Sequence, residues 1–199
     1  MPPVPRVPPF DRRATCDDLA GLPAHLVGEI IDGELHANPS PAPGVAGSAS
    51  ALGGMLLRAV DRSGGPDSWQ ILPGPELHLG ADILAPGLAG WRLSRLPGLP
   101  ATPYFSVPPD WVCEVLSSSP AAFRARKMSI YAGAGVSHAW LIDPVAHTLE
   151  VRRANDGRWT VVSMHVGDEL VRVEPFEALE LPLGALWPPA SADRRPKRR

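Results

Sequence analysis

The chain has few of the residues on which stapled or metal-bound scaffolds depend. Only two of its 199 residues are cysteine, and no C-x-x-C motif is present, so neither a disulfide framework nor a cysteine zinc site is expected. The six histidines include no H-x-x-x-H or H-x-H spacing, which argues against a histidine zinc site. We therefore expect both thiols to be reduced.

Long hydrophobic stretches are also missing. No apolar run approaches the ~18 residues that a membrane-spanning helix needs, and the N-terminal residues lack the apolar core of a signal peptide. Hydrophobic residues make up 44% of the chain and charged residues 20%, which are ordinary values for a globular protein. These features predict a cytoplasmic protein with no membrane contact.

Two common catalytic motifs are absent. No stretch reads G-x-S-x-G, so the strained nucleophile turn of a Ser-His-Asp hydrolase is not expected. The sequence Gly133-Ala-Gly135 lacks the third glycine of a dinucleotide fingerprint and follows a predicted helix instead of a strand. It is interpreted as the end of that helix.

Charge is unevenly distributed along the chain. The formal net charge is −2, but residues 191–199 hold five bases against Asp193 and carry +4, which leaves −6 on the rest. A body of that sign is a poor partner for a phosphate backbone unless its bases cluster on one face. We expect a flexible Pro-rich arm over residues 1–13, a single domain over 14–188 and a disordered basic tail over 189–199.

Turn and periodicity signals outline the domain. Asp32-Gly33 and Asn155-Asp156-Gly157 each lie between β-compatible segments, which predicts a hairpin near each end of the domain. Apolar residues at helical spacing predict a helix over Val45–Arg62. Short strands are predicted over 69–72, 76–79 and 82–85, followed by a long connection over 87–109.

The middle of the chain shows the pattern expected of buried β-strands. Trp111–Leu116 is a compact apolar run typical of a strand buried on both faces, and Ala139–Asp143 is a second such strand. A helix capped by Ser117–Pro120 is predicted between them. This strand, helix and strand have the length of a βαβ-like unit, so the sequence predicts a mixed α/β sheet.

One carboxylate, that of Glu114, lies inside the apolar strand, and the helix after it carries Lys127. A strand carboxylate facing a helical ammonium can hold a divalent ion and polarise a water molecule for attack on phosphorus. A buried Glu–Lys pair is also a common structural solution. The residues by themselves leave both interpretations open.

The order of motifs resembles the Uma-type restriction endonuclease family, which shares the PD-(D/E)XK nuclease fold. The stretches that carry this resemblance run from about His25 to Trp187 and are Val27–Leu35, Gly74–Gly80, Leu88–Arg92, Pro109–Ser117, Lys127 with Tyr131, Gly135-Val136 and Trp140–Pro144. The resemblance implies an α/β, restriction-endonuclease-like mixed β-sheet core flanked by helices, with β-hairpins at both ends of the domain.

The resemblance also implies Mg²⁺-dependent hydrolysis of DNA phosphodiester bonds. In such enzymes an Asp and a Glu from neighbouring strands bind Mg²⁺, and a Lys orients or deprotonates the attacking water. Glu114 matches the second carboxylate, Lys127 matches the lysine, and Glu29 matches an early glutamate that faces the site.

The first metal carboxylate departs from the family pattern. Where the family reads Pro-Asp before Leu-Ala-Gly-Trp, this chain has Pro86-Gly87. Asp82 is the candidate replacement, although five residues of separation put it on the opposite strand face unless the alternation is reset. Glu29 and Glu76 are further candidate site carboxylates, and their alternative interpretations are a solvated hairpin glutamate and a strand-edge charge.

Two hypotheses follow. In the first, the chain is an endonuclease in which Glu114 binds Mg²⁺, Lys127 polarises the water, and Asp82 or Glu29 completes the metal site. In the second, it is a catalytically inactive nuclease-fold protein that acts as a binding or interaction module, and the loss of the Asp favours this one. DNA is the partner that the resemblance implies, and two-fold DNA sites favour a homodimer.

Overall fold

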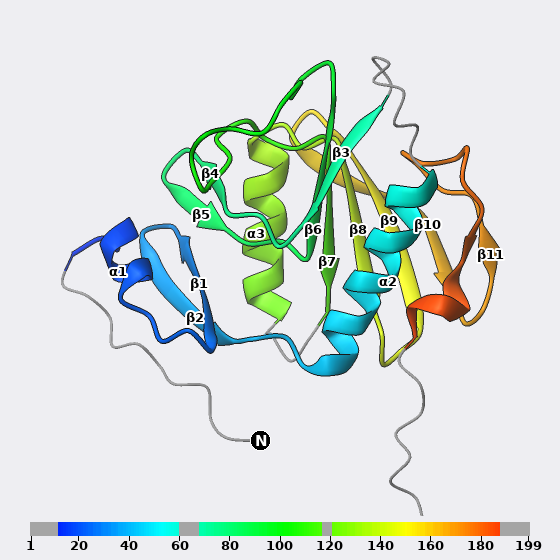
Figure 1. Cartoon of the computed structure of the whole chain (residues 1–199), viewed down its shortest axis with the longest axis horizontal. Coiled ribbons are helices and arrows are strands. Elements are labelled where there is room, and N and C mark those ends of the chain that lie inside the picture. The colour runs from blue at the N-terminus through cyan, green and yellow to red at the C-terminus, as the bar shows by residue number, and fades with distance from the viewer. Residues whose placement is uncertain (1–11, 60–67, 117–120, 188–199) are drawn as a thin grey trace, which may run out of the picture.

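The computed structural model describes residues 12–59, 68–116 and 121–187 (Figure 1). Apart from residues 12 and 13, the predicted arm lies outside the described residues, as do the basic tail and the capping stretch over 117–120. Among the described residues, none of the helices combines the length and the apolar character that crossing a membrane requires.

A six-stranded mixed sheet forms the centre of the molecule, as the sequence predicts (Figure 1). Its central strands β7 and β8 run parallel and are joined by helix α3 (Ala121–Gly133), which confirms the predicted βαβ unit. All other neighbouring strands in the sheet are antiparallel. The strands in spatial order are β10 (Arg158–Val166), β9 (Thr148–Asn155), β8 (His138–Asp143), β7 (Trp111–Val115), β6 (Leu88–Arg92) and β3 (Trp69–Pro73).

Both predicted hairpins are present. Asp32 and Gly33 have φ of 56° and 83°, and Asp156 and Gly157 have φ of 48° and 72°. Two successive left-handed residues match the right-handed twist of the flanking strands, which is why Asp-Gly pairs favour hairpins. The first hairpin, β1 (Leu26–Ile31) with β2 (Glu34–Pro39), forms a four-stranded sheet with β5 (Asp82–Leu84) and β4 (Leu77–Leu79).

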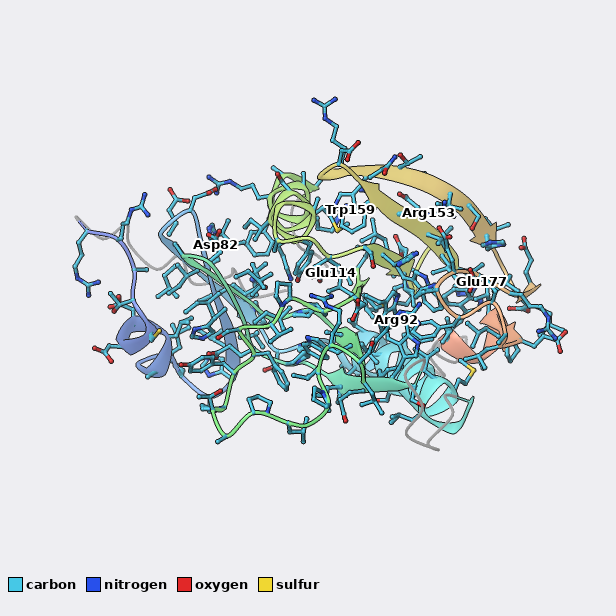
Figure 2. The ribbon with its side chains drawn as sticks, turned by 90° about the horizontal axis from the view of Figure 1, so that it is seen from above. Asp82, Arg92, Glu114, Arg153, Trp159 and Glu177 are labelled. Atoms are coloured by element: carbon cyan, nitrogen blue, oxygen red, sulfur yellow. The ribbon has the colours of Figure 1, made fainter. Side chains whose placement is uncertain are left out.

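The two faces of the six-stranded sheet are covered by different helices, which Figure 2 shows from above. Helix α2 (Pro43–Ala59) packs on one face through the fully buried Leu52 and Leu56. Helix α3 packs on the other face through Met128 and Tyr131. The remaining short elements are α1 (Cys16–Ala20), β11 (Leu170–Val171), β12 (Leu181–Pro182) and the 3₁₀-helix η1 (Leu183–Leu186).

The prediction of a long connection over residues 87–109 is wrong at its start, because β6 occupies Leu88–Arg92. This strand pairs with β3 on one side and β7 on the other. A Cβ atom at Gly90 would lie 3.2 Å from the rings of both Trp69 and Trp111. The strand therefore depends on close packing of two indoles over a glycine, which local β propensity does not reveal.

Candidate active site

Alternation along β7 determines where Glu114 points. Trp111 and Cys113 belong to the core cluster beneath α2, whereas Val112 belongs to the cluster beneath α3. Successive strand residues point to opposite faces, so Glu114 shares the α3 face with Val112. Its side chain keeps 16% exposure.

Helix α3 presents two partners to this carboxylate. Lys127 and Tyr131 are four residues apart and therefore lie on one side of the helix. The Lys127 ammonium lies 2.7 Å from Oε1 of Glu114, and the Tyr131 hydroxyl donates to the same oxygen at 2.7 Å. Both side chains are buried.

A second carboxylate reaches the same ammonium from the hairpin sheet. Oε1 of Glu29 on β1 lies 2.8 Å from Nζ of Lys127 and accepts the backbone N–H of Ala85 at 2.9 Å. Nζ of Lys127 also donates to the carbonyl oxygen of Ala85 at 3.4 Å. We call Glu29, Glu114, Lys127 and Tyr131 the buried ion cluster. The three N–H groups of the ammonium thus have three acceptors, namely Glu29, Glu114 and the carbonyl oxygen of Ala85.

Burial and charge compete in this cluster. Burial raises the pKa of Glu114, the Lys127 charge opposes that rise, and the Glu29 charge adds to it. Burial opposes the charged form of Lys127, but the charges of Glu114 and Glu29 outweigh it and raise the pKa of the ammonium. Burial and the two carboxylates raise the pKa of Tyr131 well above its usual range. Lys127 is therefore a fixed cation, and Tyr131 is a fixed hydrogen-bond donor.

Gly87 lies next to this cluster. It precedes Leu88, which pairs with Cys113, and its backbone runs against the Glu114 end of β7. A Cβ atom at Gly87 would lie 3.0 Å from the carbonyl oxygen of Cys113 and 3.4 Å from Cγ2 of Val115. The position of the expected carboxylate therefore lies against the end of β7 that carries Glu114, and the absence of a side chain lets the backbone approach this strand closely.

The structure does not bring the other two candidate carboxylates to Glu114. Asp82 lies on β5 in the four-stranded sheet, where its Oδ1 accepts the backbone N–H of Asp32 at 2.7 Å. Figure 2 shows it beside the hairpin, whereas Glu114 lies beneath α3. Glu76 is 47% exposed, and its Oε1 lies 2.7 Å from Nε2 of His78.

The residues present do not fit Mg²⁺ binding. In residues 12–59, 68–116 and 121–187, no three His, Cys, Asp or Glu side chains come together as a group that can hold a metal ion. Mg²⁺ needs near-octahedral oxygen ligands, and the two carboxylates that do converge here already share the Lys127 ammonium. With glycine at position 87, the third charge that would attract a dication is missing.

Sequence reasoning did not assign a role to Tyr131 or to the backbone of Ala85. The spacing of Lys127 and Tyr131 was a usable signal, because side chains four apart on a helix meet the same neighbour. The contribution of Ala85 leaves no mark in the sequence, since it uses only its backbone N–H and carbonyl.

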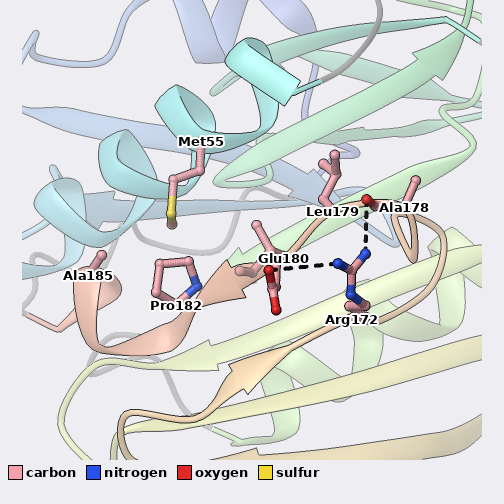
Figure 3. Close-up of a pocket in the computed structure, with 8 residues that line it drawn as sticks. Met55, Arg172, Ala178, Leu179, Glu180, Pro182 and Ala185 are labelled. Atoms are coloured by element: carbon pink, nitrogen blue, oxygen red, sulfur yellow. Dashed lines mark hydrogen bonds and ion pairs between the residues drawn. The ribbon is translucent and has the colours of Figure 1, made fainter.

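Two surface cavities lie on the α2 side of the sheet, away from the buried ion cluster. An open groove of about 560 Å³ runs between Met55 of α2 and the segment that leads to η1 (Figure 3). Across it, Arg172 lies 3.7 Å from Glu180 and donates to the carbonyl oxygen of Ala178 at 3.2 Å. The second cavity, of about 410 Å³, lies between the start of α2 and Trp187.

The mixed sheet with a strand glutamate, a helix lysine and a parallel β7–α3–β8 unit defines a restriction-endonuclease-like nuclease fold. The model of the Uma2 family, described as "putative restriction endonuclease", matches residues 22–184. The chain therefore belongs to the Uma2 family, which confirms the resemblance found in the sequence.

A solved structure supports the same fold. A crystal structure titled as a putative nuclease belonging to DUF820, from Anabaena variabilis ATCC 29413, superposes with a TM-score of 0.70 at 23% sequence identity. The match covers 87% of this chain and 97% of the other. Among curated proteins, none matches this chain.

Proposed function

We propose that this chain is a member of the endonuclease family that no longer hydrolyses DNA and uses the nuclease fold as a binding or interaction module. The observation that carries the proposal is the environment of Lys127. Its ammonium donates to Glu29, Glu114 and the carbonyl oxygen of Ala85, so its three protons already have acceptors inside the protein. A lysine held in this way has no donor left for an attacking water.

The charge balance of the site supports the same proposal. A two-carboxylate Mg²⁺ site attracts its ion because nearby negative charges are not compensated. Here Lys127 compensates one of the two, burial favours protonation of Glu114, and Gly87 contributes no charge. The ammonium thus takes over the bridging role that a metal ion has between carboxylates.

Mg²⁺-dependent cleavage of DNA is the second candidate function. One observation favours it: Oε1 of Glu29 and Oε1 of Glu114 approach the same point, within 2.8 and 2.7 Å of Nζ of Lys127. If the lysine side chain moved aside, the two carboxylates would face one dication. Glu29 would then replace the missing ligand at position 87.

Nicking of supercoiled plasmid in Mg²⁺ or Mn²⁺ separates the two functions. We expect no nicking by the wild-type protein, by Glu114→Gln or by Glu29→Gln, and no heat of Mg²⁺ binding at millimolar concentration. Nicking by the wild-type protein that disappears in both variants would establish the second candidate. The variants, purified in the same way, control for contaminating nucleases.

A gain-of-function variant sharpens the test. Gly87→Asp restores a carboxylate at the position where the family has one, at the cost of moving the Cys113 carbonyl by a few tenths of an ångström. If the missing ligand is the reason for inactivity, this variant binds Mn²⁺ measurably while Gly87→Asn, which has the same shape and no charge, does not.

DNA is the first partner to test, because the family is one of endonucleases. Several basic side chains on the described surface are engaged by acids: Arg95 lies 2.8 Å from Asp110, and Arg153 pairs with Glu174. We therefore expect weak retention on DNA that vanishes at moderate salt. Retention that persists at 200 mM salt would favour a dedicated DNA-binding role.

A further inference from the structure

Exposed apolar side chains are concentrated on strand β10. Val161, Val162, Met164 and Val166 keep 52%, 43%, 60% and 54% of their surface exposed. Large apolar side chains that are this exposed are scattered elsewhere on the described surface, but here four occur within six residues of one strand. A contiguous exposed apolar patch of this kind is typical of an interaction surface.

The register with β9 places most of these side chains on one face. Val161 pairs with Arg152 and Met164 pairs with Glu150, with a bulge between Val161 and Ser163. Arg152 and Glu150 are two residues apart and share a face, so their partners share it too. Val161 and Met164 are three residues apart, which in a regular strand would put their side chains on opposite faces. The bulge adds one residue to the strand and returns Met164 to the face of Val161. Val166, two residues after Met164, continues this apolar row of Val161, Met164 and Val166.

The apolar row lies on the face that α3 covers, but beyond the reach of that helix. Glu150 pairs with Leu141, which belongs to the core cluster beneath α3. At the start of β10, Trp159 is tied to α3, since its Nε1 donates to the carbonyl oxygen of Met128 at 2.6 Å. Further along the strand the helix no longer covers the sheet, which leaves the row exposed.

On the opposite face of β10, the polar side chains of Ser163 and His165 are satisfied by local contacts. Nε2 of His165 lies 3.0 Å from Oγ of Ser163, and Nδ1 of His165 lies 3.0 Å from Oε2 of Glu169. Within the part of the chain that the structure describes, β9 pairs with β10 on one side and no strand pairs with it on the other, so β10 offers one apolar face and one free edge.

The charges around β10 suit pairing with a second copy in one direction. Arg158 begins the strand and Asp168 follows its end, and both residues are exposed. In antiparallel pairing, Arg158 of one protomer comes to the end that carries Asp168 of the partner subunit. In parallel pairing the two arginines would lie together. The pairing of Arg158 with Asp168 therefore favours a two-fold, antiparallel arrangement.

We propose that the chain forms a homodimer in which the free edges of two β10 strands pair antiparallel across a two-fold axis. The pairing satisfies backbone groups along both edges and brings the two apolar rows side by side on one continuous face. A second copy fits better than an unrelated protein because this chain supplies both charges that the pairing needs, with Arg158 at the start of β10 and Asp168 just after its end. The proposal does not depend on whether the protein cleaves DNA.

Light scattering on the full chain during size-exclusion chromatography tests the proposal. The expected mass is about twice the 21.2 kDa of one chain, falling towards one chain on dilution. Met164→Lys puts a cation on each apolar row and raises the dimer Kd by about a hundredfold or more. Val145→Lys is the matched control, because Val145 is 91% exposed in the β8–β9 loop and its variant stays dimeric.

A charge swap tests the direction of pairing. Arg158→Asp raises the dimer Kd by about tenfold, and adding Asp168→Arg restores the wild-type value. Val166→Lys replaces Met164→Lys if circular dichroism shows that the latter is unfolded. A wild-type protein that is monomeric at all concentrations overturns the proposal, and so does a Met164→Lys variant that stays dimeric. Failure of the swap to restore dimerisation overturns the antiparallel arrangement.

Discussion

Nζ of Lys127 lies 2.7 Å from Oε1 of Glu114, and this contact fastens helix α3 to the central strand β7. Because Lys127 also reaches Glu29 on β1, one buried ammonium links the helix, the six-stranded sheet and the hairpin sheet. Such a link acts on stability whether or not the site performs chemistry. It therefore offers tests that do not require an activity assay.

Replacement of Lys127 by Met should strongly destabilise the protein. The variant keeps the length of the side chain but leaves two buried carboxylates without their cation, which costs about 3–5 kcal/mol. Urea unfolding followed by tryptophan fluorescence measures the difference. The neighbouring Arg126→Met is the control: Arg126 is 45% exposed and pairs with Asp32 and Glu34 on the surface, so its loss costs at most about 1 kcal/mol. Equal losses in the two variants would mean that the cluster contributes no more than a surface pair.

The hydroxyl of Tyr131 should matter more than that of Tyr104, the other tyrosine of the chain. Tyr131→Phe removes a buried donor to Glu114 at 2.7 Å and leaves the carboxylate less satisfied, which costs about 1–3 kcal/mol. Tyr104 stacks on His78 at 3.9 Å through its ring, which Phe preserves, so Tyr104→Phe changes stability by less than about 0.5 kcal/mol. Thermal unfolding of both variants checks the comparison, and a larger loss for Tyr104→Phe would contradict it.

Much of the fold was predictable because local signals and tertiary packing agree there. Asp32-Gly33 and Asp156-Gly157 occupy left-handed backbone positions, and the turn residues alone specify both hairpins. Strand β6 was missed because Ala89 and Gly90 at its centre carry little β propensity. The rings of Trp69 and Trp111, each 21 positions away in the sequence, pack over Gly90, and no local pattern reports these contacts.

The candidate site was predictable only in part. The hairpin prediction and the family resemblance pointed to Glu29, Glu114 and Lys127, and the structure brings these three together. Face alternation relates Asp82 to the residues after Pro86 only if all of them lie on one strand. In the structure β5 and β6 belong to different sheets, so face alternation cannot relate Asp82 to Gly87. At Ala85–Gly87 the chain passes from the four-stranded sheet to the six-stranded sheet. This passage is set by the global topology, and short-range periodicity carries no information about it.

The pH dependence of stability tests which force dominates at Glu114. Burial raises the pKa of this carboxyl above its ordinary value near 4.5, against the opposing charge of Lys127. The folded protein then holds the proton more tightly than the unfolded chain does. The contribution of Glu114 to stability is therefore greatest below about pH 4.5 and falls as pH rises through the raised pKa.

Glu114→Gln isolates that contribution, because the variant lacks the titrating group and ionisable groups outside the buried ion cluster cancel in the comparison. We expect the free energy of unfolding of the wild type, minus that of Glu114→Gln, to decrease with rising pH from about 4.5 and then to level off. Urea unfolding at several pH values between 4 and 9 gives this difference. A difference that grows with pH would show that the charge of Lys127 outweighs burial and lowers the pKa.

The two cysteines allow opening of the site to be followed chemically. Cys113 lies on β7 beside Glu114 and is fully buried, and burial and the neighbouring carboxylate raise the pKa of its thiol well above the usual range. Cys16 is exposed. Since thiolates are the reactive species, a maleimide at pH 7.5 should modify Cys16 within minutes and Cys113 only when β7 separates from its neighbours.

In Cys16→Ser, where Cys113 is the remaining thiol, the labelling rate reports the population of the open form when closing is faster than labelling. Adding Lys127→Met should then accelerate labelling by about a hundredfold or more, because a loss of about 3 kcal/mol corresponds to roughly two decades in an equilibrium constant. Adding Arg126→Met should change the rate by less than about fivefold. Labelling of Cys113 as fast as Cys16 in the wild-type protein would contradict the buried placement of β7. If Lys127→Met accelerates labelling of Cys113 but does not lower the stability measured in urea by a matching amount, the cluster controls local opening of β7 and not global unfolding.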